Sequence, residues 1–116
     1  MTHPTTVPVT QLPAPVRSYL TAHAAGDVDG ALAAFSPTAV VVDQGVTFQG
    51  TDAVRTFLVG AGAEFDYTTQ LLGAERVDDA VWVAHNRLEG DFPGGVADLA
   101  YPFEVSGDLI ASLHIT

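Results

Sequence analysis

The sequence predicts an α+β fold in which three N-terminal helices pack on one face of a curved antiparallel sheet. Apolar residues recur at helical spacing in the first third of the chain, whereas the second half consists of β-branched and aromatic runs separated by turn residues. Helices followed by strands are typical of α+β folds and not of alternating βαβ units. Because helices on one face of a bent sheet leave a hollow between the two layers, we expect a cone-shaped pocket there.

Length and composition indicate one small, soluble domain. The chain has 116 residues, and a hydrophobic fraction of 47% can fill one core without disulfides, which the absence of cysteine rules out. We expect a flexible arm over residues 1–12, which are rich in Thr and Pro, and a single domain over residues 13–116. No apolar stretch is long enough for a membrane span, and the first residues do not resemble a secretory signal, so we expect a cytoplasmic location.

The charge of the chain restricts its partners. Acidic residues outnumber arginines by 14 to 4, there is no lysine, and the formal net charge is −10. Such a surface repels nucleic acid and anionic membranes, so we expect neither as a partner. The four histidines lack metal-ligand spacing, and no glycine-rich phosphate loop follows a strand, so we expect no metal and no cofactor. The lysine-free composition, rich in Ala, Gly and Val, favours a bacterial source.

Proline, glycine and apolar spacing predict the helices. A first helix should begin near Pro13 and end at Gly26, because it carries an apolar stripe at i, i+3, i+4 and i+7, namely Val16, Tyr19, Leu20 and His23. Asp27 can cap a second helix, whose stripe ends at Phe35 before Ser36-Pro37 stops it. A third helix opens at residues 50–52, and its expected buried face consists of Val54, Phe57, Leu58 and Ala61.

Beta-branched runs and turn residues predict the strands. The run Thr38–Asp43 suits a first strand, and residues 47–49 suit a short second one. Longer strands are expected over residues 66–77, 80–91, 96–105 and 109–116, because turn residues separate these segments. Successive strands joined by tight turns form an antiparallel meander.

Several motifs of the first half together resemble a known family. They are a tyrosine on the first helix, the A-G-D-x-D-G linker at residues 25–30, Phe35 at the close of the second helix and an aspartate at the end of the first strand. Residues 50–55 match the entry to the third helix. The segment from Val16 to Gly45 thus resembles the opening of ketosteroid isomerases and SnoaL-like polyketide cyclases. Both families belong to the nuclear-transport-factor-two-like superfamily. The resemblance therefore implies a cystatin-like fold for nearly everything after residue 13.

The resemblance implies roles for individual side chains. In ketosteroid isomerase a first-helix tyrosine donates a hydrogen bond to the developing enolate and a first-strand aspartate moves the proton; the matching positions are Tyr19 and Asp43. Tyr101 matches the second oxyanion donor, which is a neutral aspartic acid in that enzyme. A tyrosine, with a reference pKa of about 10, is protonated at neutral pH without a special environment. Leu58 stands where some isomerases carry a supporting tyrosine.

Strand alternation, combined with the resemblance, predicts which side chains line the pocket. The inward set of the last strands is Trp82, Ala84, Asn86, Leu88, Leu99, Tyr101, Phe103, Ile110, Ser112, His114 and Thr116. With Leu58 from the third helix, this set gives an apolar pocket with Tyr19, Asp43, Asn86, Tyr101 and His114 as its polar points. Such a pocket suits a small apolar or carbonyl-containing ligand. The opposite face, with His85, Arg87, Glu89 and Asp98, would be solvated or would face a dimer partner.

Each candidate residue also has a structural interpretation. Asp43 could bond the backbone of the turn that follows it, Tyr19 needs only one partner for its hydroxyl in a core, and His114 could be a hydrogen-bonded core residue. Asn86 could pair with a neighbouring strand. Trp82 could serve packing alone.

Two functional hypotheses of different class remain. The first is a homodimeric isomerase or cyclase-like lyase that abstracts a proton beside a carbonyl, with Asp43 as base, Tyr19 and Tyr101 as oxyanion donors and His114 as proton relay. The second is a non-catalytic ligand-binding or dimerisation module with the same hollow. The resemblance implies the homodimer, because members of the family commonly pair through the outer sheet face.

Overall fold

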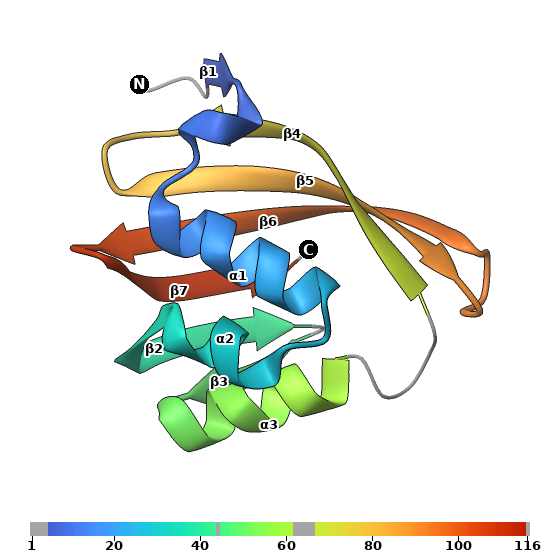
Figure 1. Cartoon of the computed structure of the whole chain (residues 1–116), viewed down its shortest axis with the longest axis horizontal. Coiled ribbons are helices and arrows are strands. Elements are labelled where there is room, and N and C mark those ends of the chain that lie inside the picture. The colour runs from blue at the N-terminus through green and yellow to red at the C-terminus, as the bar shows by residue number, and fades with distance from the viewer. Residues whose placement is uncertain (1–4, 44, 62–66, 116) are drawn as a thin grey trace.

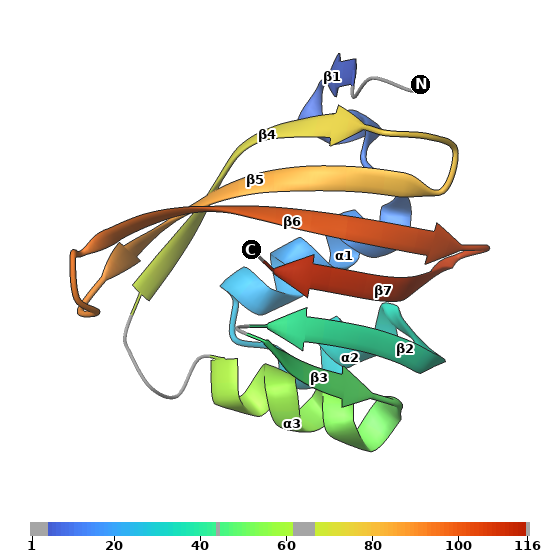
Figure 2. The ribbon, with the colours of Figure 1, turned by 180° about the vertical axis from the view of Figure 1, so that it is seen from behind.

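Three helices cover one face of a curved sheet, as the sequence predicts (Figure 1; Figure 2). The sheet has seven strands, one more than the six expected. The structure, a computed structural model, describes residues 5–43, 45–61 and 67–115. The strand order is β1-β4-β5-β6-β7-β2-β3, and all neighbouring strands are antiparallel except β2 and β7. This parallel pair departs from the expected antiparallel sheet. It is possible because a helix and four strands separate β2 from β7, so no tight turn forces them to run in opposite directions.

The first two helices, α1 (Ala14–Ala24) and α2 (Val28–Ala33), are joined by a tight linker. Gly26 in this linker has a φ of 71°, a left-handed conformation that favours glycine. The Asp27 side chain then caps α2 by accepting a hydrogen bond of 2.9 Å from the Gly30 backbone N–H. Phe35 was expected to close α2, but it is the first residue of β2 (Phe35–Asp43). The reason is local, because Pro37 disfavours helical geometry at Ser36 and extends the chain earlier than the apolar stripe indicates.

The third helix, α3 (Thr51–Ala61), packs beside α2 and against the β2–β3 hairpin (Figure 1). Val54, Phe57 and Leu58 are buried, as the helical spacing predicts. The Phe57 ring lies 5.4 Å from the ring of Phe48 on β3 (Val46–Gln49). These contacts fix α3 to the edge of the sheet.

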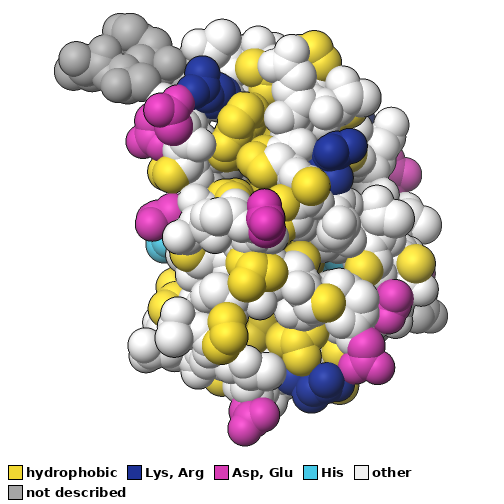
Figure 3. Space-filling model, turned by 60° about the vertical axis from the view of Figure 1, so that its left-hand side comes forward, with side chains coloured by type: hydrophobic (Ala, Val, Ile, Leu, Met, Phe, Trp, Pro, Cys, Tyr) yellow, Lys and Arg dark blue, Asp and Glu magenta, His cyan; other side chains and the backbone are white. Residues whose placement is uncertain are grey.

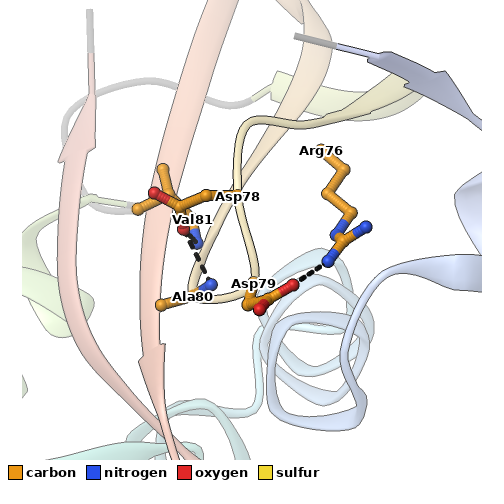
Figure 4. A network of polar contacts seen from close by, with 5 residues as sticks. All are labelled: Arg76, Asp78, Asp79, Ala80 and Val81. Carbon is orange, nitrogen blue, oxygen red and sulfur yellow. Dashed lines mark hydrogen bonds and ion pairs between the residues drawn. The ribbon is translucent and has the colours of Figure 1, made fainter. Parts of the chain in front are cut away.

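The remaining strands are β4 (Tyr67–Arg76), β5 (Val81–Gly90), β6 (Val96–Ser106) and β7 (Leu109–Ile115), which begin and end within two residues of their predicted bounds. Figure 4 shows the turn between β4 and β5, where Asp78 Oδ1 accepts hydrogen bonds from the backbone N–H groups of Ala80 at 2.8 Å and Val81 at 2.9 Å. Arg76 pairs with Asp79 in the same turn. The predicted Asp-Asp turn therefore forms, and its first aspartate organises the backbone.

The N-terminal segment corrects a prediction. Within the expected flexible arm, Thr5–Val7 form strand β1, which pairs with β4, and Val9–Gln11 form a short 3-10 helix, η1. Leu12 is only 1% exposed, and its carbonyl accepts a hydrogen bond of 2.9 Å from Arg17 Nε. Residues 5–12 therefore belong to the fold, because β4 offers an edge for pairing and Leu12 fills the core.

The core lies between the helices and the concave face of the sheet. Its buried apolar residues come from α1, α2, α3 and strands β2, β4, β5, β6 and β7. On the side of the molecule in Figure 3, hydrophobic side chains gather in a band down the middle, and acidic side chains lie mostly toward the edges. Among the described residues, no helix has the length and apolar character needed to cross a membrane.

Candidate functional site

The candidate site is the region of the concave face where strands β6 and β7 separate from each other. Within the described residues their pairing runs from Ser106 opposite Leu109 to Phe103 opposite Leu113. Beyond this point β6 continues beside β5, whereas β7 continues beside β2. Figures 1 and 2 show β6 rising away from β7 toward this end of the molecule. The sheet thus presents two arms here, one formed by β2 and β7 and the other by β5 and β6.

The floor of the site is a row of apolar side chains at the last β6–β7 pair. Val41, Leu113 and Phe103 lie opposite one another across β2, β7 and β6, and all three are buried. Trp82 continues this row on β5, opposite Phe103. The Arg76 guanidinium lies 5.6 Å from the centroid of the Trp82 ring, in a cation–π contact. Trp82 and Phe103 therefore form part of the packed base of the site.

Asp43 ends β2, two residues beyond Val41, and so its side chain lies on the same concave face. The carboxyl is half-buried, and burial raises its pKa above the ordinary value of 3.8. Within the described part of the chain, no hydrogen bond or ion pair of this carboxylate is found. Asp43 thus has the character of a proton acceptor at the edge of an apolar interior.

Tyr101 lies on the other arm, two residues from Phe103 on β6 and on the same face. It is 4% exposed and lies opposite Ala84 on β5. Two strand spacings, about 10 Å, separate the backbones of β2 and β6 where the strands are still paired, and the distance grows where they part. The aspartate and the tyrosine therefore face the candidate site from its two arms.

Asn86 lies on β5, two residues beyond Ala84 and on the same face of the sheet. It is 1% exposed, and its side-chain Nδ2 has no hydrogen-bond partner among the described residues. Its cross-strand neighbours are Leu71 on β4 and Leu99 on β6. The possibility that Asn86 pairs with a neighbouring strand through this amide nitrogen is therefore not realised.

Tyr19 approaches from α1 and packs on the apolar floor. It is fully buried, and its ring lies edge-on to Phe35 at 5.3 Å and to Phe103 at 5.7 Å. The ring also stacks on His23, one helical turn further along α1, with 5.6 Å between the centroids. The resemblance pointed to Tyr19 but not to His23.

His23 is a residue that the sequence interpretation placed only at the edge of the helical stripe. It is half-buried in the last turn of α1, and burial lowers its pKa from the ordinary value of 6.5. The last turn of α1 and the last residues of β2 lie at the same end of the molecule (Figure 1; Figure 2). A tyrosine and a histidine at i and i+4 necessarily share a helix face, and this signal could have included His23.

The structure contradicts the predicted inward orientation of His114 and Ser112. A β-bulge in β7 shifts the register, since Val105 lies opposite Ile110 whereas Glu104 lies opposite Ser112. Ile110 and Leu113 are buried, whereas His114 is exposed. Because the extra residue reverses the alternation, Ser112 and His114 share the outer face of the sheet with Glu104, and His114 does not reach the site.

The other predicted lining residues remain on the inner side. Ile110 and Leu58 are buried in the core, and Leu88 is half-buried two residues beyond Asn86. All four arginines have a polar partner outside the site, namely Leu12, Asp29, Asp79 or Asp98. Among the described residues there is no cluster of three or more His, Asp or Glu side chains that could hold a metal ion. The site is therefore apolar with a few polar groups, and the Arg76 guanidinium that contacts Trp82 at its base is paired with Asp79.

The comparisons with known proteins agree with this architecture. A candidate polyketide cyclase from Sinorhizobium meliloti is 32% identical, with 92% of this chain and 97% of that chain covered and a TM-score of 0.86. A Catenulispora acidiphila protein with a ketosteroid isomerase-like fold, in complex with trimethylamine, is 16% identical, with 90% and 85% covered and a TM-score of 0.78. A Mycobacterium tuberculosis protein in complex with estradiol-17β-hemisuccinate is 18% identical, with 87% and 88% covered and a TM-score of 0.72.

The last two likenesses show the fold alone at these identities, and no curated protein matches the chain. The SnoaL-like domain family, in contrast, matches residues 16–112, which is most of the sequence and runs from the first turn of α1 into β7. The chain therefore belongs to the SnoaL-like domain family.

Proposed function

We propose that this chain acts on a small, mostly apolar carbonyl compound by removing a proton from the carbon beside the carbonyl, with Asp43 as the base. One observation carries the proposal: the half-buried Asp43 carboxyl lies on the concave face, and burial raises its pKa. A general base is most effective when its pKa approaches the pH at which the protein operates. The similarity to a candidate polyketide cyclase supports the same class of chemistry.

The proposed reaction proceeds through an enolate. The proton passes from carbon to an oxygen of Asp43, and the electron pair of the broken C–H bond moves toward the carbonyl oxygen. Tyr19 and Tyr101 are proposed to donate hydrogen bonds to this oxygen, where the negative charge develops. In an isomerisation Asp43 returns the proton to another carbon. In an aldol-type cyclisation the enolate carbon attacks a second carbonyl, and the proton goes to the new alkoxide.

A second candidate function is binding without catalysis. It is favoured by the tight packing of Tyr19 and Tyr101, which are 0% and 4% exposed and belong to the hydrophobic core. Relatives of the same fold form complexes with small molecules, namely trimethylamine and a steroid hemisuccinate. A binding module would need the apolar interior but not the basicity of Asp43.

Deuterium exchange separates the two functions. The α-protons of an apolar ketone such as 2-tetralone can be followed by NMR in D₂O, with the wild type, Asp43→Asn and the control Glu104→Gln, whose side chain is exposed on the outer face. We expect the wild type to accelerate exchange, Asp43→Asn to lower that rate by at least about 100-fold, and the control to leave it unchanged. Full activity of Asp43→Asn would rule out the base. Binding of the ketone without exchange would favour the second candidate function.

The same variant has a predicted stability that serves as an independent check. The raised pKa means that ionised Asp43 destabilises the folded state above this pKa. We therefore expect Asp43→Asn to unfold at higher urea concentration than the wild type at neutral pH. The difference should shrink as the pH falls through the raised pKa, and it should be lost below the ordinary value of 3.8, where both states are protonated.

We also propose that the chain forms a homodimer through the outer face of the sheet. Arg87 donates to Asp98 at 2.8 Å and 3.1 Å across β5 and β6, and His85 pairs with Glu75 on β4. These contacts occur within one chain, and the half-buried Ala100 and Pro102 lie beside them on β6. Such a surface supports pairing with a second copy.

A further inference from the structure

We propose that the Asn86 amide is the ligand-anchoring donor of the candidate site and that it selects an uncharged compound with an oxygen acceptor. The inference rests on the proposed function for the location of the ligand, and it adds the side chain that holds the ligand and the requirement that the ligand be uncharged. Asn86 is not assigned a part in the proton transfer.

The amide nitrogen of Asn86 is isolated inside the protein. Asn86 Nδ2 is fully buried and has no hydrogen-bond partner in the described part of the chain. Apart from the hydroxyls of Tyr19 and Tyr101, Asn86 carries the only polar side-chain group among the described buried residues. Buried amides in native proteins are nearly always paired, and an unpaired one destabilises the fold, so each such group requires a reason.

The neighbours of the Asn86 side chain are apolar. Side chains opposite each other on adjacent strands share one face of the sheet, and those of Asn86 are Leu71 and Leu99. The same-face neighbours on its own strand are Ala84 and Leu88. None of these four side chains can accept a hydrogen bond. The register therefore surrounds a strong donor with apolar groups, on the same face and only one step from Tyr101.

The charges around the site restrict the charge of the ligand. The chain has no lysine, and three of its four arginines have their partners outside the site. The fourth, Arg76, contacts Trp82 at the base of the site, but it is already paired with Asp79. Burial of Asp43 and a formal net charge of −10 both disfavour an anion near Asn86. A neutral carbonyl oxygen, in contrast, satisfies the amide without bringing a charge into the apolar interior.

Three naphthalene probes of similar shape test the proposal by equilibrium binding. 2-Acetylnaphthalene carries a neutral acceptor, 2-ethylnaphthalene carries none, and 2-naphthoate carries an anion. We expect the wild type to bind the ketone about tenfold more tightly than the hydrocarbon and to bind the carboxylate more weakly than the ketone. Asn86→Leu should reduce the preference for the ketone over the hydrocarbon to about onefold, while the hydrocarbon still binds. The control Glu89→Leu, on the outer face of the same strand, should keep the wild-type preference.

Stability adds a second measurement. Without ligand, Asn86→Leu should be at least as resistant to urea as the wild type, because the substitution removes an unpaired polar group from the core. An unchanged preference for the ketone in Asn86→Leu, tighter binding of the carboxylate than of the ketone, or no binding of any probe to the wild type would each overturn the proposal. These binding ratios are independent of the exchange rate that tests Asp43. The expected ratios can be observed when Asp43→Asn leaves exchange unchanged, and exchange can depend on Asp43 when the expected ratios are not observed.

Discussion

His23 illustrates how a single residue acquires a chemical character from its neighbours. Its ring stacks on Tyr19 with an angle of 13° between the planes, and burial lowers its pKa below 6.5. A histidine held neutral at physiological pH can accept a proton from a neighbouring group or donate one through its N–H. The stack therefore places a neutral imidazole beside the tyrosine that we propose as an oxyanion donor.

The lowered pKa of His23 predicts how stability depends on pH. In acid the unfolded chain takes up a proton at His23 more readily than the folded chain, so the folded state loses stability as the pH falls below about 6.5. Replacing His23 by phenylalanine keeps a stacking ring but removes the proton site. We expect urea unfolding of His23→Phe to be less sensitive to a change from about pH 8 to about pH 5 than that of the wild type.

The measurement at the higher pH serves as the control, because both side chains are uncharged there and any difference reflects packing alone. An equal loss of stability in acid for both proteins would contradict the assignment. The comparison uses the difference between the two proteins at each pH, so other titrating groups cancel.

Alternation from sequence predicted the position of most, but not all, site residues. Asn86, Tyr101 and Phe103 are buried on one face, as the period of two requires. The predicted orientation of His114 is wrong because a β-bulge reverses the alternation in β7. No turn residue in the sequence marks the extra residue of this bulge. The alternation of side chains along a strand does not reveal where one extra residue is inserted. The register had to come from the pairing of β7 with its neighbours.

At the scale of elements, the conformation of the linker between α1 and α2 explains which residue types it contains. Gly26 takes a positive φ, Asp27 caps α2, and Gly30 lets the cap reach the backbone. A Cβ built at Gly30 would lie 2.3 Å from Asp27 Oδ2, too close for both to keep their places. The A-G-D-x-D-G motif is therefore a helix–helix connection, and its conformation requires no catalytic role.

This geometry predicts coupling between Asp27 and Gly30. In the wild type, Gly30→Ala should displace the cap, losing about 1 kcal/mol, while gaining a similar amount from helix propensity. In the Asp27→Ala background only the gain remains. Urea unfolding of the two single variants and the double variant should give a coupling free energy of about 1 kcal/mol. The close approach of the new methyl group to Ala22, at 3.3 Å, is common to both backgrounds and cancels.

Additive effects of the two substitutions would contradict this account of the motif. The same substitutions should leave binding of the naphthalene probes unchanged, because the Asp27 side chain is exposed and contacts the backbone of Gly30. A loss of binding would assign the linker a functional role after all.

Elements with local signals were predictable, whereas those that depend on distant pairing were not. Helical stripes and turn residues located α1, α3 and the meander strands within two residues. Strand β1 was missed because three residues with a proline on either side carry little periodicity, and only the edge of β4 makes them a strand. The parallel pairing of β2 with β7 is equally non-local, and nothing within either segment specifies its direction.

At the scale of the whole molecule, the net charge and the sheet face set the conditions for self-association. Each chain carries a formal charge of −10, and the helices occupy one face of the sheet while the outer face is uncovered (Figure 2). On that face the arginine and the aspartate of the Arg87–Asp98 pair already neutralise each other. Two copies would therefore repel each other at long range and would be held by the less polar residues of the face.

The proposed dimer should consequently become stronger with salt. The Debye length falls from about 30 Å at 0.01 M to about 10 Å at 0.1 M ionic strength, so salt screens the repulsion between two acidic chains more than it weakens apolar contacts. We expect the dimer dissociation constant, measured by sedimentation, to fall between these two salt concentrations. Ala100→Glu, in the centre of the outer face, should give a folded monomer, and the control Ala14→Glu, exposed at the start of α1, should remain dimeric. Dissociation by salt would instead indicate ion pairs across the interface, and a monomer under all conditions would rule out pairing through this face.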